Sequence, residues 1–290
     1  MDFVHGRDLL EICQKDNKKI SQVMLEREIE LGNLNEEEIL EKLGYSLKIM
    51  KDAAHGPLET PQKSLGGLIG GEGKKITDFA STNKAYALCG DALTRAIAYS
   101  MAVLEVNGAM GLIVAAPTAG SSGVVPGAVL AAGEAFEADD EKLLEALLNA
   151  SALGYIFMRN ASVSGAEAGC QAEVGAASAM AASALVEMMG GSPAQCLSAA
   201  AMALSNLLGL VCDPIAGLVE SPCQSRNAIG VANAFTCAQI AISGVMNVVP
   251  FDEMVDAMYK VGCALPMELR ETALGGCAAT PTGCSHCKNR

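Results

Sequence analysis

The stretch Cys170–Met189 reads CQAEVGAASAMAASALVEMM and ends against Gly190 and Gly191. Alanine is the strongest helix former, and its small side chain lets neighbouring helices approach closely. A glycine pair directly after such a run is typical of a helix end. The stretch therefore predicts a helix within a core built from small residues.

The rest of the chain extends this prediction. Of 290 residues, 51% are hydrophobic and 18% charged, and Trp is absent, so Ala, Leu, Val, Ile and Met must fill the core. Few segments alternate in the manner of a strand. Helices are predicted over Thr94–Val106, Asp140–Arg159, Pro193–Gly209, Asn227–Val245 and Asp252–Ala264. We expect a mostly α fold, with a compact Ala/Gly-rich helical domain.

The N-terminal region differs in composition. Leu9–Leu43 is rich in Glu, Lys and Asn, with apolar residues at helical spacing. Asn35 precedes three glutamates, a pattern typical of a helix N-cap. We expect residues 1–50 to form an N-terminal amphipathic helical arm packed on a main domain of residues 51–290, the two making one structural unit.

Glycine and proline mark the expected loops. Gly56–Gly73 and Ala116–Gly127 are rich in these residues, Cys212–Cys223 is irregular, and the tail Gly275–Arg290 is also expected to be a loop.

The charge pattern excludes several function classes. A net charge of −13 argues against a nucleic-acid groove and against docking on anionic membranes. Val106–Gly133, Met188–Cys212 and Asn227–Phe251 lack charge, but polar residues, Gly or Pro interrupt each, which favours buried helices over membrane spans. The charged segment Met1–Lys19 has no secretory signal, so we expect a cytoplasmic protein.

Eleven cysteines in such a chain indicate reduced thiols, some of them metal ligands. Three stand out by position. Cys170 precedes a predicted helix, whose start favours a thiolate, whereas Cys212 and Cys223 bound a Pro/Gly-rich loop. Their spacing is no general metal motif. Cysteines within apolar helices are expected to be core residues, namely Cys13, Cys89, Cys196, Cys237 and Cys263.

A family resemblance singles out these three cysteines. Ser205–Ala228 reads SNLLGLVCDPIAGLVESPCQSRNA and resembles the signature of the iron–sulfur L-serine dehydratases. Ala168–Gly175 and Ala116–Gly127 are similar to that family's second cysteine segment and its substrate loop. Gly67–Gly71 and Thr280–Gly283, the latter with Gly275 and Gly276 before it, also fit. The resemblance covers residues from about 15 to 284.

The resemblance implies a lyase of amino-acid catabolism, with residues 51–290 as its catalytic domain. Such an enzyme converts L-serine to pyruvate and ammonia with a [4Fe–4S] cluster, whose three ligands fall on Cys170, Cys212 and Cys223. Three ligands leave one iron open as a Lewis acid for the departing hydroxyl. The chain resembles the α subunit of the two-chain type, which implies a separate β subunit.

The substrate carboxylate requires donors. The loop residues Thr118, Ser121, Ser122 and Gly123 are candidates, although the same pattern also fits a plain turn. Arg226 is a further candidate, and a structural salt bridge is its alternative.

The base that removes the Cα proton stays open. His55 and Lys63 are weak candidates, since His55 also fits an exposed loop position.

Other interpretations remain. A pyridoxal-phosphate lyase could hold its phosphate in Ala119–Gly123, and a non-catalytic subunit could merely carry a cluster. Threonine or cysteine could replace serine as substrate. The tail thiols Cys284 and Cys287 could cap the open iron, form half of a zinc site, or lie in a disordered end.

Overall fold

The computed structural model describes residues 2–83 and 88–287, and across these ranges it contains helices and loops but no strand. The mostly α prediction is confirmed. The helices are α1 (Gly6–Asp16), α2 (Ile20–Gly32), α3 (Glu36–Glu59), α4 (Glu72–Thr82), α5 (Gly90–Gly108), α6 (Val124–Ala135), α7 (Asp140–Asn160), α8 (Gly165–Ala168), α9 (Ala176–Met188), α10 (Pro193–Asn206), α11 (Cys223–Ile242), α12 (Phe251–Ala264) and α13 (Pro281–Cys287).

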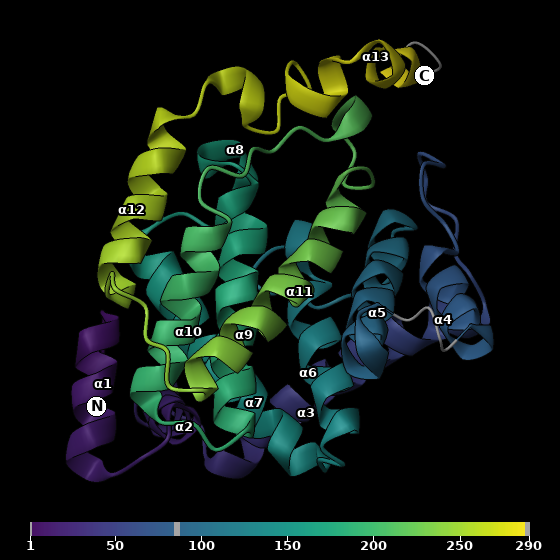
Figure 1. Cartoon of the computed structure of the whole chain (residues 1–290). Coiled ribbons are helices and arrows are strands. Elements are labelled where there is room, and N and C mark those ends of the chain that lie inside the picture. Colours follow the sequence, from purple (N-terminus) through teal and green to yellow (C-terminus); the bar gives the residue numbers. More distant parts are fainter. Residues whose placement is uncertain (1, 84–87, 288–290) are drawn as a thin grey trace.

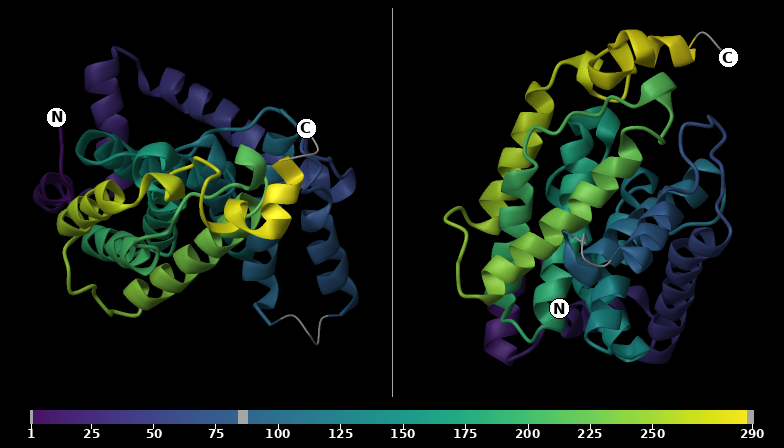
Figure 2. Two further views of the ribbon diagram at one scale, coloured as in Figure 1. Left: turned by 90° about the horizontal axis from the view of Figure 1, so that it is seen from above. Right: turned by 45° about the vertical axis from the view of Figure 1, so that its right-hand side comes forward.

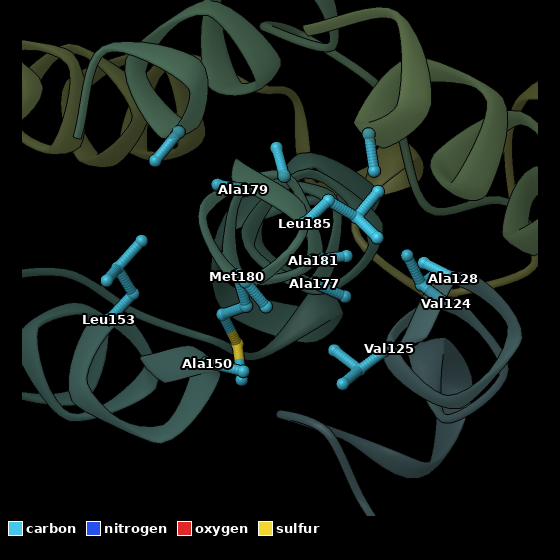
Figure 3. Packing of buried hydrophobic residues seen from close by; sticks show 14 of the residues in the cluster. Val124, Val125, Ala128, Ala150, Leu153, Ala177, Ala179, Met180, Ala181 and Leu185 are labelled. Carbon is cyan, nitrogen blue, oxygen red and sulfur yellow. The ribbon is translucent and has the colours of Figure 1, made fainter. Parts of the chain in front are cut away.

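Helix α9 lies at the centre of the molecule, as Figure 1 shows. Its alanines are buried, and α6, α7, α10 and α11 pack around it. Figure 3 shows Val124 and Val125 of α6 on one side of α9 and Ala150 of α7 on another. Because alanine side chains are short, these helices can lie close together. The alanine-rich stretch thus forms the core helix that its sequence predicts.

That stretch does not begin as a regular α-helix. Gln171–Gly175, labelled η3, forms a π-helical turn directly after Cys170, and α9 starts only at Ala176. Such turns widen a helix locally and are frequent at functional sites. The five other predicted helices correspond to α5, α7, α10, α11 and α12.

The N-terminal helices contribute to the same core. Leu9, Ile20 and Val23 are fully buried and belong to one hydrophobic cluster with α7 and α9. The predicted cap of α3 is confirmed, because Asn35 accepts a hydrogen bond from the Glu38 amide at 2.9 Å and the Glu38 carboxylate accepts one from the Asn35 amide.

Three predicted loops are shorter than expected. Helix α3 continues through the buried Pro57, so the first loop spans 60–71. Helix α6 begins at Val124 because Pro126 lies in its first turn, where no intrahelical N–H is needed. The tail prediction was wrong over Pro281–Cys287, since this proline starts α13, and its last residues, 288–290, lie outside the described residues.

The membrane question has a direct structural answer. Among the described residues, no helix combines the length and the apolar character needed to cross a bilayer. The uncharged stretches are divided among shorter helices and the loops between them.

The segments that carry the predicted cysteine ligands meet at one end of the helical bundle. The π-helical turn η3, the segment before α11 and the chain leading to α13 all meet there, away from α1 (Figure 1). Figure 2 shows the C-terminal segment crossing this end in both views.

Candidate functional site

Three buried thiols lie at this end of the bundle. Cys170 and Cys212 are each 3% exposed and Cys223 is 6% exposed, and none forms a disulfide. The three come from η3, from the segment after α10 and from the start of α11. A charge on Cys223 raises the pKa of both Cys170 and Cys212, so the three thiols lie near one another. The fold thus brings together the three cysteines predicted as ligands.

Backbone contacts hold Cys212 in place. Its N–H donates to the Leu269 carbonyl at 2.9 Å, and its own carbonyl accepts from the Glu271 amide at 2.7 Å. These two bonds form a short parallel bridge to the C-terminal segment. The side chain of Gln171 links the same region to η3, since it accepts from the Gly209 amide. Cys212 is therefore fixed from both sides.

Burial raises the pKa of all three thiols and so favours their protonated form when no metal is bound. It raises the pKa of Cys223 to about 12, with a further rise from Glu173 and an opposing effect from Arg226. Burial likewise raises the pKa of Cys170 and Cys212. The start of a helix favours a thiolate, as predicted for Cys170, but burial outweighs it here. A bound metal would displace these protons.

Three cysteine thiols are a donor set that iron–sulfur clusters use. Within the described ranges, no three His, Cys, Asp or Glu side chains converge on one ion position. The ligands of a cube-shaped cluster stand apart, one on each of several irons. A Cβ on Gly165 would lie 3.0 Å from the Cys212 sulfur, so glycine keeps that thiol clear. Three buried, unpaired thiols thus fit the cluster that the resemblance implies.

Arg226 forms a salt bridge. Its Nη1 lies 2.6 Å from Asp213 Oδ1 and donates to the Val211 carbonyl at 2.8 Å. The buried Asp213 also accepts from the Cys277 amide at 2.6 Å. Arg226 therefore supports the cysteine loop, and its charge also reaches Cys170 and Cys223.

The predicted substrate loop lies beside these thiols. It begins with a cis bond between Ala116 and Pro117 and contains the short 3-10 helix η2 (Ala119–Ser121). The Ser122 hydroxyl donates to the Ala119 carbonyl, and the Ser121 hydroxyl lies 3.1 Å from that of Thr118. Both serines are fully buried, so their hydroxyls stabilise the turn itself.

Asn227 clamps this loop, and sequence reasoning did not assign it a role. Its Oδ1 accepts from the Gly123 amide at 3.0 Å. Its Nδ2 donates to the carbonyls of Gly120 and Cys223 at 2.8 and 2.9 Å. One buried side chain therefore ties the loop to a thiol-bearing residue. Its place in the Arg-Asn-Ala signature was the available signal.

Glu173 is a second residue that the sequence did not single out. Its Oε1 accepts from the Thr118 hydroxyl at 2.8 Å, and the Cys212 sulfur lies 3.8 Å from its Oε2. Burial raises its pKa, although the Thr118 hydrogen bond opposes this. A carboxylate thus faces both the loop and a thiol.

The two candidate bases contact residues other than the three thiols. His55 Nε2 pairs with Glu134 at 3.4 Å, and its ring stacks edge-on with Tyr99. Because Glu134 is ten residues beyond Val124 on α6, it lies about 15 Å along that helix from the loop. Lys63 is exposed in the glycine-rich loop, near Gly67. Neither makes a hydrogen bond to the thiols or to Thr118–Gly123 within the described chain.

The five cysteines that were predicted to be core residues divide into two groups. Cys13, Cys196 and Cys237 are buried as predicted, but Cys89 and Cys263 are exposed, so that interpretation was wrong for these two. The tail thiols Cys284 and Cys287 are exposed on α13.

These features define an all-helical protein with a buried three-thiol centre beside a clamped Gly/Ser loop. Residues 15–278 match the family model described as serine dehydratase alpha chain, and the chain belongs to that family.

Curated relatives agree with this assignment. The chain is 46% identical over 281 residues to a probable L-serine dehydratase alpha chain of Bacillus subtilis, covering 97% of this chain and 93% of that protein. It is 45% identical over 278 residues to the L-serine dehydratase alpha chain of Peptoniphilus asaccharolyticus, covering 96% and 94%. An L-serine dehydratase of Streptomyces coelicolor is 37% identical, and the match covers 97% of this chain but 62% of that protein.

Proposed function

We propose that this chain is the catalytic α chain of an L-serine dehydratase, which converts L-serine to pyruvate and ammonia. The observation that carries the proposal is the meeting of three buried, unpaired thiols beside the loop Thr118–Gly123. Cys170, Cys212 and Cys223 would hold a [4Fe–4S] cluster. When bound, such a group supplies a Lewis acid that stabilises the departing hydroxide.

The chain's own groups have separate tasks. The amides of Ala119 and Gly120 donate to no protein acceptor in the described chain, so they are available to the substrate carboxylate. Asn227 holds these amides at a fixed distance from Cys223. Arg226 bonds to Asp213 and Val211 through its Nη1, and its charge also acts on Cys170 and Cys223, so we assign it to the compensation of bound thiolates.

A separate β chain is part of the proposal. The Bacillus and Peptoniphilus relatives are alpha chains by name and match this chain almost end to end. The Streptomyces protein is longer, because the match covers 62% of it. We propose that a second polypeptide, the β chain, corresponds to the part of the longer relative that this chain does not match.

Replacing Cys170, Cys212 or Cys223 by serine tests the proposal. We expect each anaerobically purified variant, with its β chain, to lose bound iron, the broad visible absorption of the cluster and pyruvate formation from L-serine. The cause is the loss of one of only three ligands. Cys263→Ser removes an exposed thiol on α12 and should leave all three measurements unchanged.

Other outcomes would favour the alternatives. Pyruvate formation without iron, accompanied by a sharp absorption band that borohydride removes, would indicate pyridoxal phosphate. Bound iron without turnover of any amino acid would indicate a subunit that only carries a cluster. Assays with L-threonine and L-cysteine, run in parallel, decide the substrate preference.

A further inference from the structure

We infer that Glu173 binds the α-ammonium group of the amino-acid substrate and thereby selects amino acids over other hydroxy acids. The inference rests on the proposed function, because it assigns a substrate contact within the same site.

The position of Glu173 carries the first step. The residue lies in the π-helical turn η3, three residues after Cys170. Its carboxylate accepts a hydrogen bond from Thr118 of the substrate loop and also contacts the sulfur of Cys212. A group bound beside this carboxylate would therefore lie between the loop and the thiols, where the reacting molecule has to be.

Two glycines leave room for this carboxylate at its present position. A Cβ on Gly120 would lie 2.9 Å from Glu173 Oε1. A Cβ on Gly165 would lie 2.5 Å from Oε2, which is closer than real Cβ atoms come to other atoms. Both glycines come from segments other than that of Glu173. Larger residues at either position would displace the carboxylate from its present place.

The charged groups around Glu173 are the third observation that supports the inference. No Lys, Arg or His of the described chain lies within salt-bridge distance of Glu173, and Arg226 pairs with Asp213 instead. Glu271 is the other charged group that acts on this carboxylate, and it adds negative charge. A partly buried carboxylate without a cation is costly, and a bound ammonium would supply the missing charge. Glu173 remains partly exposed, so a ligand can reach it.

The experiment compares two ligands that differ only in the ammonium group. The α–β complex with its iron is assayed with L-serine, and 3-hydroxypropanoate, which lacks the amino group, serves as a competitive inhibitor. For Glu173→Gln we expect the KM for L-serine to rise roughly 10- to 100-fold, the range for loss of a charged hydrogen bond. The inhibition constant of 3-hydroxypropanoate should change less than about 3-fold, because it never made that contact.

Two further variants make the result specific. Glu173→Asp keeps the negative charge but shortens the side chain by one methylene. We therefore expect a smaller rise in KM than for Glu173→Gln. Glu167→Gln removes an exposed carboxylate that bonds to Ser162, and it should alter neither constant. Iron content and melting temperature are measured for each variant.

Three results would overturn the inference. One is a fall in kcat with KM unchanged, which would place Glu173 in the chemical step. Another is equal weakening of L-serine and 3-hydroxypropanoate. The third is loss of iron from both folded variants, which would mean that the carboxylate supports the thiols. Failure of the proposed function looks different, because the unsubstituted complex would then form no pyruvate.

Discussion

Asn227 shows how a single side chain can join the two parts of the site. Its amide group makes three hydrogen bonds, two to the substrate loop and one to the carbonyl of Cys223. The side chain is fully buried, so water cannot replace these bonds. The distance between loop and thiol thus depends on one residue.

Asn227→Ala should therefore alter both stability and substrate binding. Three backbone groups would lose their partner, and we expect a loss of about 1–3 kcal/mol in the free energy of unfolding. The KM for L-serine should rise because the loop is released. Asn233→Ala is the matched control on the same helix, since Asn233 bonds to Ser178 and Ala203 instead. Denaturant unfolding and steady-state kinetics of both variants check this; a KM unchanged in Asn227→Ala would refute the clamp.

At the scale of single residues, sequence reasoning found some groups and missed others for physical reasons. The resemblance to a family pointed to the three cysteines, and the fold brings them together. The direction of the Ser121 and Ser122 hydroxyls could not be predicted from the sequence. Both donate to carbonyls of their own turn. Glu173 was missed because nothing in one sequence reveals that it will face Thr118, 55 residues away.

At the scale of helices, local signals fixed the type of each element better than its ends. The alanine-rich stretch predicted α9, but the π-helical turn before it has no composition signature. Loop ends were misplaced where burial overrides glycine content, as at Val124, which is fully buried in α6. Pro57 lies within the loop predicted for Gly56–Gly73, yet α3 accommodates it in its last turn.

The cap of α3 is the local signal that worked, and it can be tested alone. Asn35→Ala removes the side chain that accepts from the Glu38 amide and leaves that donor to water. We expect a loss of about 1 kcal/mol in the free energy of unfolding. Asn35→Ser keeps a capping oxygen and should lose far less. Urea titrations give both values; equal losses for Ala and Ser would show that the cap contributes nothing.

At the scale of the whole molecule, the N-terminal helices α1 and α2 contact helices that come much later in the chain. Asp252 at the start of α12 accepts hydrogen bonds from the amides of Gly6 and Arg7, at 2.6 and 3.0 Å, and so caps α1. Lys19, next to α2, pairs with Glu145 of α7 at 3.0 Å. These contacts, together with the buried apolar residues of α1 and α2, support our prediction that arm and catalytic domain form one structural unit.

Leu9→Ala tests that prediction, because Leu9 is fully buried in α1 while belonging to the same core cluster as α9. Removing this side chain should cost about 2–5 kcal/mol. If the chain unfolds as one unit, hydrogen exchange should show the same loss of protection in α9 as in α1 and α2. Loss confined to α1 and α2 would instead mean that the arm opens on its own. Leu31→Ala, at a position 51% exposed in α2, is the control and should change protection in neither region.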